Sequence, residues 1–150
     1  MKLDEALKRL SPQYLAGLID GEGCITITSS DGRYQGKIVV EMTAQSVVEA
    51  LAVRYRILMR TPKPRTNQAG IRKASYRAEL TGEKALELAL EIEPYLIDKA
   101  PQLEILIKFL RYKVRWKSLK IRSMSPETLS LYAKMKQELQ DLKHKYDENS

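Results

Sequence analysis

One stretch constrains the fold of this chain more than any other, residues 15–23 with the sequence LAGLIDGEG. A Ser-Pro pair at positions 11–12 precedes it, and this pair is typical of a helix N-terminus. The sequence therefore predicts a short helix that begins there and ends at Gly21. Its residues are mostly apolar, and the small Ala16 and Gly17 among them favour close packing against another helix.

Two acidic residues, Asp20 and Glu22, lie at the C-terminal end of this predicted helix. The helix dipole already places partial negative charge at that end, so we expect a positive group nearby. Glycines flank Glu22 on both sides, which lets the backbone turn and direct the carboxylate, together with the Gly21 carbonyl, toward a ligand. Oxygen ligands of this kind suit Mg²⁺. The alternative is an ordinary helix with solvated acids.

These nine residues resemble the signature of the LAGLIDADG homing endonucleases and match it at seven positions, with Gly21 for alanine and Glu22 for aspartate. The resemblance implies a magnesium-dependent endonuclease in which Glu22 and Gly21 hold the metal. It also implies that Gln45 orients a water molecule and that Lys99 lies near the scissile phosphate, which makes Glu22, Gln45 and Lys99 the expected catalytic residues. Glu49 stands where some members of the family have a basic residue.

The resemblance further implies the reaction, which is site-specific hydrolysis of both strands of a long pseudo-palindromic double-stranded DNA target by an enzyme of the intron-encoded homing type. The chain contains one copy of the signature, which implies a homodimer whose helices meet through Leu15, Ala16, Gly17 and Ile19. A non-catalytic relative, such as an intron maturase or a transcription factor, is the alternative, and such relatives often lose the acid that Glu22 supplies. The absence of catalytic cysteine and histidine blocks disfavours a protein-splicing element.

The rest of the chain reads as two β-hairpins alternating with helices. Residues 24–30 and 33–43 alternate apolar and polar side chains around an Asp-Gly turn, which is typical of a hairpin. A second hairpin is predicted near residues 60–80, where two prolines favour an edge strand or irregular segment. The other predicted helices cover about 45–55, 81–93, 98–112 and 125–146.

This order predicts a single α+β domain with a four-stranded antiparallel sheet, helices on one face of it and further C-terminal helices. It matches the αββαββα core that the family resemblance implies, over about residues 11–110, followed by a helical extension over about 111–150.

The face of the sheet that the helices leave open is the predicted DNA-binding surface. Its positions carry hydroxyl, amide and basic side chains, which contact phosphates and read bases in DNA. They are Thr26, Thr28, Ser30, Arg33, Gln35, Lys37, Arg60, Lys63, Arg65, Arg72, Lys73, Ser75 and Arg77. A solvated face is the alternative, but residues 54–77 hold eight basic residues and no acidic one, and such a run repels itself without a polyanion. A basic segment at 111–122 is expected to add phosphate contacts.

Composition agrees with an anionic partner, because the net charge is +7 and the pI is about 9.5. Cys24 is the only cysteine, so it forms no intrachain disulfide and points to a reducing compartment. No signal peptide or apolar run of membrane length is recognisable. The sequence therefore predicts a soluble intracellular protein, in the cytoplasm or an organelle, without a membrane partner.

Overall fold

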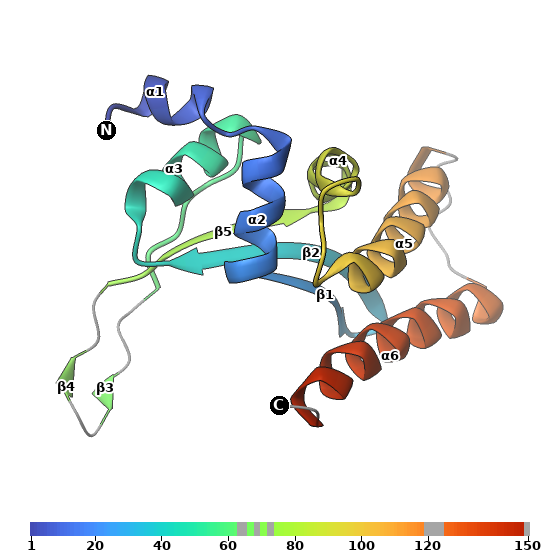
Figure 1. Ribbon diagram of the computed structural model, residues 1–150. Coiled ribbons are helices and arrows are strands. Elements are labelled where there is room, and N and C mark those ends of the chain that lie inside the picture. Colours follow the sequence, from blue (N-terminus) through green and yellow to red (C-terminus); the bar gives the residue numbers. More distant parts are fainter. Residues whose placement is uncertain (63–65, 68–69, 72–73, 119–124, 149–150) are drawn as a thin grey trace.

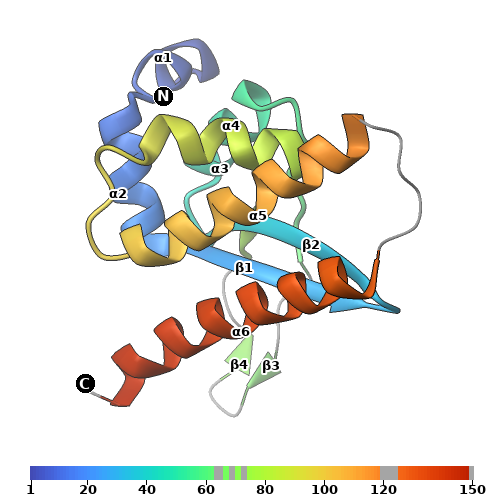
Figure 2. The same ribbon diagram turned by 90° about the vertical axis from the view of Figure 1, so that its right-hand side faces the viewer.

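A computed structural model of the chain describes residues 1–62, 66–67, 70–71, 74–118 and 125–148. The described part is an α+β structure in which helices cover one face of an antiparallel sheet (Figures 1 and 2). Its elements in chain order are α1 (Leu3–Lys8), α2 (Pro12–Glu22), β1 (Gly23–Ser30), β2 (Arg33–Met42), α3 (Gln45–Arg54), β3 (Thr66–Asn67), β4 (Gly70–Ile71), β5 (Tyr76–Thr81), α4 (Gly82–Ile92), α5 (Ala100–Ser118) and α6 (Pro126–Glu148).

The main sheet has the strand order β1-β2-β5. The β1–β2 hairpin turns at Asp31 and Gly32, whose φ angles of 52° and 73° match the tight turn predicted there. In the register, Ile25 pairs with Ile38 and Val40 pairs with Ala78, and all four side chains are buried. Because side chains alternate along a strand, their neighbours point to the opposite face, which we call the outward face.

Helices α2 to α5 pack over the buried face, and Tyr132 and Leu139 of α6 also belong to the core. Gly36 shows how close α5 comes, because a Cβ at this position would lie 2.9 Å from a methyl group of Leu106 and 3.0 Å from Phe109. Leu106 and Phe109 are themselves fully buried. The missing side chain of Gly36 therefore lets α5 lie directly on β2.

Of the predicted four-stranded sheet, the described residues contain three strands, and a separate two-stranded pair, β3–β4, follows the same chain segment; part of the segment expected to form the fourth strand lies outside the described residues. The strand expected beside β5 is reduced, in the described part, to one bridge in which Arg60 and Arg77 exchange backbone hydrogen bonds of 2.8 and 2.7 Å. Pro62 follows two residues later and has no N–H to continue a ladder.

The C-terminal region is helical, as predicted, but α5 extends to Ser118 and takes up residues 111–118 of the basic segment. Helix α6 then runs alongside β1, the edge strand of the sheet, on the other side of β1 from α5 (Figures 1 and 2). Lys136 donates to the Ser29 hydroxyl at 2.7 Å, and Lys143 lies 3.5 Å from the Cys24 sulfur. Among the described residues, no helix is long and apolar enough to cross a membrane.

Candidate active site and nucleic-acid interface

Helix α2 begins as the sequence predicts, with Pro12 as its first residue and the Ser11 hydroxyl accepting the Tyr14 N–H at 3.1 Å. Its end differs from the prediction, because Gly21 is helical and the helix stops at Glu22. The residue that requires glycine is Gly23, where a Cβ would lie 2.8 Å from the backbone of Ile19. The first residue of β1 therefore packs directly against the backbone of the last turn of α2.

The positive group expected at the end of α2 is Lys99. Its ammonium donates hydrogen bonds to the carbonyl oxygens of Ile19 at 2.8 Å, Asp20 at 3.1 Å and Gly23 at 2.5 Å. These carbonyls carry the partial negative charge of the helix end, so Lys99 acts as a C-terminal cap for α2.

The Asp20 side chain also holds the end of α2 against the connection between α4 and α5. Its carboxylate accepts the backbone N–H groups of Ile97 at 2.9 Å and Lys99 at 3.0 Å. The α4–α5 connection is thereby tied to the end of the signature helix. Asp20 is a structural residue, and the ammonium predicted to lie near the scissile phosphate is held by backbone carbonyls.

Glu22 and Gly21 are both exposed at the same helix end. The carboxylate and the neighbouring carbonyl are hard oxygen donors of the type that Mg²⁺ prefers. Within the described part of the chain, however, no three His, Cys, Asp or Glu side chains gather as a metal site would require. The oxygen ligands suit Mg²⁺, but the described residues of a single chain supply only part of its coordination shell.

The predicted water-orienting residue, Gln45, is exposed as the first residue of α3. Gly23 pairs with Val40 in the sheet, so the start of β1 and the end of β2 lie at the same end of the hairpin. Glu22 directly precedes β1, and Gln45 follows β2 by three residues, so both residues lie at this end of the hairpin. Glu49 lies one turn further along α3 and is half-buried.

The outward face collects most of the predicted DNA-binding residues. Thr26, Thr28, Ser30, Arg33, Gln35 and Lys37 alternate with the buried residues of β1 and β2 and are half-buried or exposed. On the second hairpin Arg60 is exposed and its backbone is bonded to that of Arg77. The β3–β4 pair and α6 both extend to this side, away from α2 and α4 (Figure 1). Lys63, Arg65, Arg72 and Lys73 lie outside the described residues.

The predicted absence of counter-ions along the basic run is wrong, because Glu79 of β5 lies among the cations. Its carboxylate is 2.7 Å from the Lys37 ammonium and 3.3 Å from the Arg77 guanidinium. The hydrogen bond from Lys37, strengthened by Arg77, holds the pKa of Glu79 below its usual value. Nearby, the Ser75 hydroxyl lies 3.5 Å from the Glu41 carboxylate. The alternation of Ser75, just before β5, with Arg77 and Glu79 in β5 was the sequence signal that places Glu79 on this face.

Arg54, at the start of the basic run, is structural. Its guanidinium donates to the Leu10 carbonyl and to the Glu91 carboxylate, each at 2.6 Å. It therefore joins α3 to α4 and to the turn before α2, so it belongs to the packing of the helices and not to the outward face.

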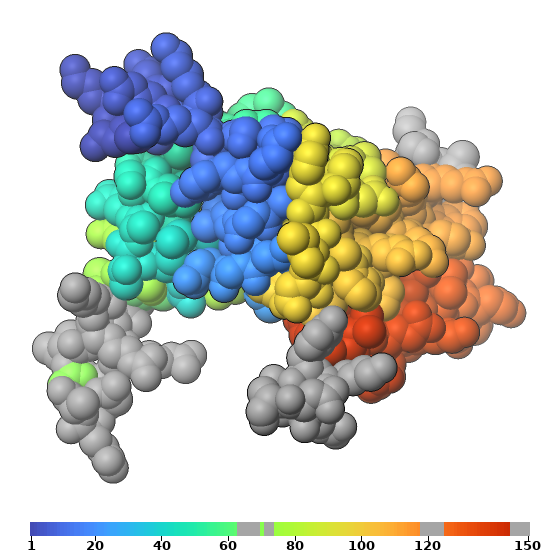
Figure 3. Space-filling model, in the orientation of Figure 1, coloured from blue at the N-terminus to red at the C-terminus, as the bar shows by residue number. Residues whose placement is uncertain are grey.

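Three of the four residues predicted to form the dimer contact are buried within their own chain. Leu15, Ala16 and Ile19 are at most 1% exposed because they face the core of their own chain. Gly17 is exposed, and a Cβ there meets nothing within 4 Å. The surface that α2 offers is the opposite side, seen as a blue strip between α3 and the α4–α5 connection in Figure 3, with Tyr14 45% exposed on it.

No protein-family model matches the sequence, and no curated protein matches it significantly. Solved structures do match in fold. The homing endonuclease I-CvuI, in complex with the I-CreI target and magnesium with the DNA not cleaved, has a TM-score of 0.63 and 18% identity, over 94% of this chain and 85% of that one. An archaeal intron-encoded homing endonuclease, I-Vdi141I, complexed with DNA, has a TM-score of 0.65 and 15% identity, over 87% and 82%.

A longer protein, the LAGLIDADG meganuclease I-AabMI bound to uncleaved DNA, matches with a TM-score of 0.61 and 18% identity, over 85% of this chain and 44% of that one. At these identities the likeness is one of fold. The likeness in fold coincides with the sequence resemblance at residues 15–23, which form helix α2 and its junction with β1. The chain has the fold of the LAGLIDADG homing endonucleases.

Proposed function

We propose that the chain is a site-specific endonuclease of the homing type, which binds double-stranded DNA on its outward face and cleaves both strands as a homodimer. The observation that carries this proposal is the exposed carboxylate of Glu22, at the helix end that meets the start of β1. A strand of about 10 residues spans about 33 Å, or about 10 base pairs of DNA, so two copies would cover about 20. The two homing endonuclease structures named above are complexes with DNA, which supports this choice of substrate.

In this proposal Glu22 and the Gly21 carbonyl hold Mg²⁺. Octahedral Mg²⁺ takes six ligands, so the partner's signature helix, the DNA phosphates and water would supply the remainder. The ion would stabilise the negative charge that develops on the phosphate during hydrolysis. Two carboxylates brought close together repel each other, so this pairing of Glu22 residues depends on the cation and on the charge of Lys99 nearby.

Other residues of the chain would orient water, position Glu22 and bind the DNA. Gln45, exposed at the same end of the hairpin as Glu22, would orient water toward the phosphate. Lys99 is a positioning residue, because its ammonium holds the carbonyls at the end of α2 and keeps Glu22 in place. The outward face would contact the bases and backbone, with Lys37 and Arg77 releasing Glu79 when phosphates arrive.

The homodimer would form through the exposed side of α2. Gly17 and Gly21 are four residues apart and so share one side of the helix, with Tyr14 one turn before them. Ile97, whose backbone is bonded to Asp20, is 84% exposed beside this helix end. An apolar and glycine-containing helix surface of this kind allows two backbones to approach closely.

The test is cleavage and DNA affinity measured side by side, on targets found by incubating the protein with magnesium and a randomised duplex library and sequencing the cut ends. Glu22→Gln should lower the cleavage rate by orders of magnitude and keep or raise the affinity, because the outward face is untouched. Glu83→Gln, which removes an exposed carboxylate from the first turn of α4, is the matched control and should cut normally. Cleavage by Glu22→Gln at the original rate would refute the proposed metal site.

A non-catalytic nucleic-acid-binding protein is the second candidate, and two observations favour it. Lys99 is engaged with backbone carbonyls, and Glu49 occupies a position that is basic in some family members. The same experiment separates the candidates, because this alternative predicts selective retention of duplexes from the library without any cut ends.

A further inference from the structure

An open cavity lies at the tip of the β1–β2 hairpin, at the end of the sheet remote from Glu22. Strand β5 ends at Thr81, opposite Lys37, whereas β2 begins at Arg33. The first residues of β2 therefore have no partner on that side among the described strands. Gly82, with a φ of 57°, turns the chain away into α4, and α5 and α6 lie on either side of the hairpin tip (Figure 2). The resulting cavity has a volume of about 960 Å³.

Three cations line this cavity, Arg33, Lys113 and Lys117, against one carboxylate, that of Asp31. In the part of the chain that the structure describes, none of these three side chains forms an ion pair or a hydrogen bond. Burial lowers the pKa of Lys113, whose ammonium lies 5.6 Å from the centre of the Tyr132 ring. Its charge is thus partly withdrawn from water, and no carboxylate among the described residues is paired with it. An anion in the cavity would compensate this charge.

The Tyr132 hydroxyl is the second indication of a ligand. Tyr132 is 1% exposed, packs at 4.9 Å from Phe109 between ring centroids, and lines the cavity. Its hydroxyl is buried without a hydrogen-bond partner among the described residues, a condition that costs stability unless a ligand or water satisfies it. Burial also raises the pKa of this hydroxyl, so it stays protonated and available as a donor.

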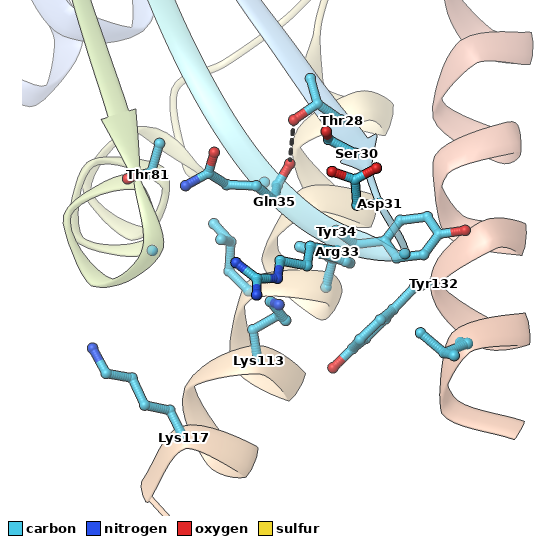
Figure 4. Close-up of a pocket in the computed structure, with 16 residues that line it drawn as sticks. Thr28, Ser30, Asp31, Arg33, Tyr34, Gln35, Thr81, Lys113, Lys117 and Tyr132 are labelled. Carbon is cyan, nitrogen blue, oxygen red and sulfur yellow. Dashed lines mark hydrogen bonds between the residues drawn. The ribbon is translucent and has the colours of Figure 1, made fainter. Parts of the chain in front are cut away.

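Figure 4 shows how the polar groups are arranged. The nitrogen ends of Arg33, Gln35 and Lys117 point to the same open side, toward Thr81, and Lys113 and Tyr132 lie beside each other at the base. Guanidinium and ammonium groups only donate hydrogen bonds, whereas amide and hydroxyl groups both donate and accept. A site that offers several donors and carries an excess of positive charge suits a compact oxyanion with several acceptor oxygens.

We propose that this cavity is a phosphate-binding site, held by Lys113, Lys117 and Arg33 with the Tyr132 hydroxyl as a buried donor. The site is distinct from the metal site; a nucleic-acid source of the phosphate rests on the proposed function, and a free phosphate compound does not. The phosphate belongs either to the backbone of a nucleic acid that extends past the hairpin or to a free phosphate compound, and the two sources share the same chemistry.

The first experiment measures thermal unfolding in phosphate and in chloride at equal ionic strength, for the unmodified protein, Tyr132→Phe and Lys113→Met. Phosphate should raise the unfolding temperature of the unmodified protein. Tyr132→Phe should unfold at the same or a higher temperature in chloride, because it removes an unsatisfied buried hydroxyl, yet it should bind phosphate about tenfold more weakly. Lys108→Met is the control, since it removes an exposed cation of α5 that is paired with Glu104 away from the cavity.

The second experiment identifies the source of the phosphate by comparing a duplex that carries only the target with one extended at both ends. If Lys113→Met loses the affinity that the extension adds, the ligand is the nucleic-acid backbone; if it binds both duplexes normally but fails to bind phosphate, the ligand is a free phosphate compound. Absence of any phosphate effect on the unmodified protein, or an equal loss in Lys108→Met, would overturn the proposal. Because the first experiment contains no DNA, its failure leaves the proposed endonuclease unaffected.

Discussion

The carboxylate of Asp20 accepts the backbone N–H of Lys99 at 3.0 Å, and the Lys99 ammonium donates back to the Asp20 carbonyl oxygen at 3.1 Å. The two residues thus bind each other through side chain and backbone in both directions. This reciprocal contact joins the end of α2 to the segment before α5, which are far apart in sequence. It holds the end of the signature helix in a fixed position relative to the start of α5.

We expect Asp20→Asn to destabilise the fold, because an amide cannot accept both N–H groups with the strength of a carboxylate. The loss should be about 1–3 kcal/mol in the free energy of unfolding, measured by chemical denaturation. Lys99→Met should lose a similar amount by leaving three carbonyls without their cap. Asp98→Asn, an exposed neighbour, is the control and should be nearly neutral. Unchanged stability in Lys99→Met would show that the cap is unimportant.

Replacing each of the two glycines that flank Glu22 with alanine should change the stability of the fold in opposite directions. At Gly23 the added Cβ meets the Ile19 backbone at 2.8 Å, so Gly23→Ala should cost about 1–3 kcal/mol of stability. At Gly21 nothing lies within 4 Å, and alanine in a helix is favoured over glycine by up to about 1 kcal/mol, so Gly21→Ala should be neutral or stabilising. Thermal unfolding of both variants checks the pair, and a reversed order would contradict the assigned end of α2.

The exposed side of α2 predicts how Gly17 affects assembly. Gly17→Leu should leave the monomer folded, because the side chain enters open space, and should weaken the proposed dimer by separating the two helices. Sedimentation and unfolding measured together distinguish these effects, with Gly17→Ala as the smaller step. A stable monomer of the unmodified protein at concentrations where it cuts DNA would refute the dimer.

Glu79 predicts a dependence of stability on pH. Lys37 and Arg77 lower its pKa in the folded protein below the ordinary value of 4.5, so the charged form stabilises the fold. This contribution is fully present above pH 4.5 and is lost as the pH falls through the lower, folded value. The stability difference between the unmodified protein and Glu79→Gln should therefore be largest near neutrality and shrink below pH 4.5. A difference that is constant with pH would refute the ion pair.

The same residue predicts an effect on DNA binding, if the outward face is the interface. Glu79→Gln removes the carboxylate that competes with phosphates for Lys37 and Arg77, so affinity should rise and its dependence on salt should become steeper. Glu83→Gln, on α4, changes the net charge equally and serves as the control. An equal rise in both variants would attribute the effect to net charge alone.

The sequence was sufficient to predict the first hairpin, since the alternation of Ile25 and Ile27 and the Asp31-Gly32 turn are local signals. It also predicted a positive group at the end of α2. It could not identify Lys99 as the positive group that caps α2, because the contact joins residues that are distant in the chain. The buried side of α2 was likewise ambiguous, because Leu15, Ala16, Leu18 and Ile19 are apolar around most of the helix and only packing decides which of them face inward.

The second hairpin shows a different limit. Its basic residues were recognised in the sequence, but the ion pairs of Glu79 depend on the pairing of β5 with β2, which brings Glu79 next to Val39 and within reach of Lys37. Counting charges along residues 54–77 alone therefore gave a higher positive charge on the outward face than the ion pairs leave unpaired. Four of the predicted contacts, Lys63, Arg65, Arg72 and Lys73, lie outside the described residues and stay predictions.

Helix α6 lies against β1 through the Lys136–Ser29 contact and carries the buried Leu139, so it restricts access to the free edge of that strand. A bare edge strand is a template on which a second copy adds its own strand, and repeated addition of this kind is open-ended. With α6 in place, β1 is covered along its free edge, and growth by strand addition there would first require α6 to detach. The proposed homodimer would therefore use helix surfaces, where a two-fold contact uses the same patch on both copies and stops at two.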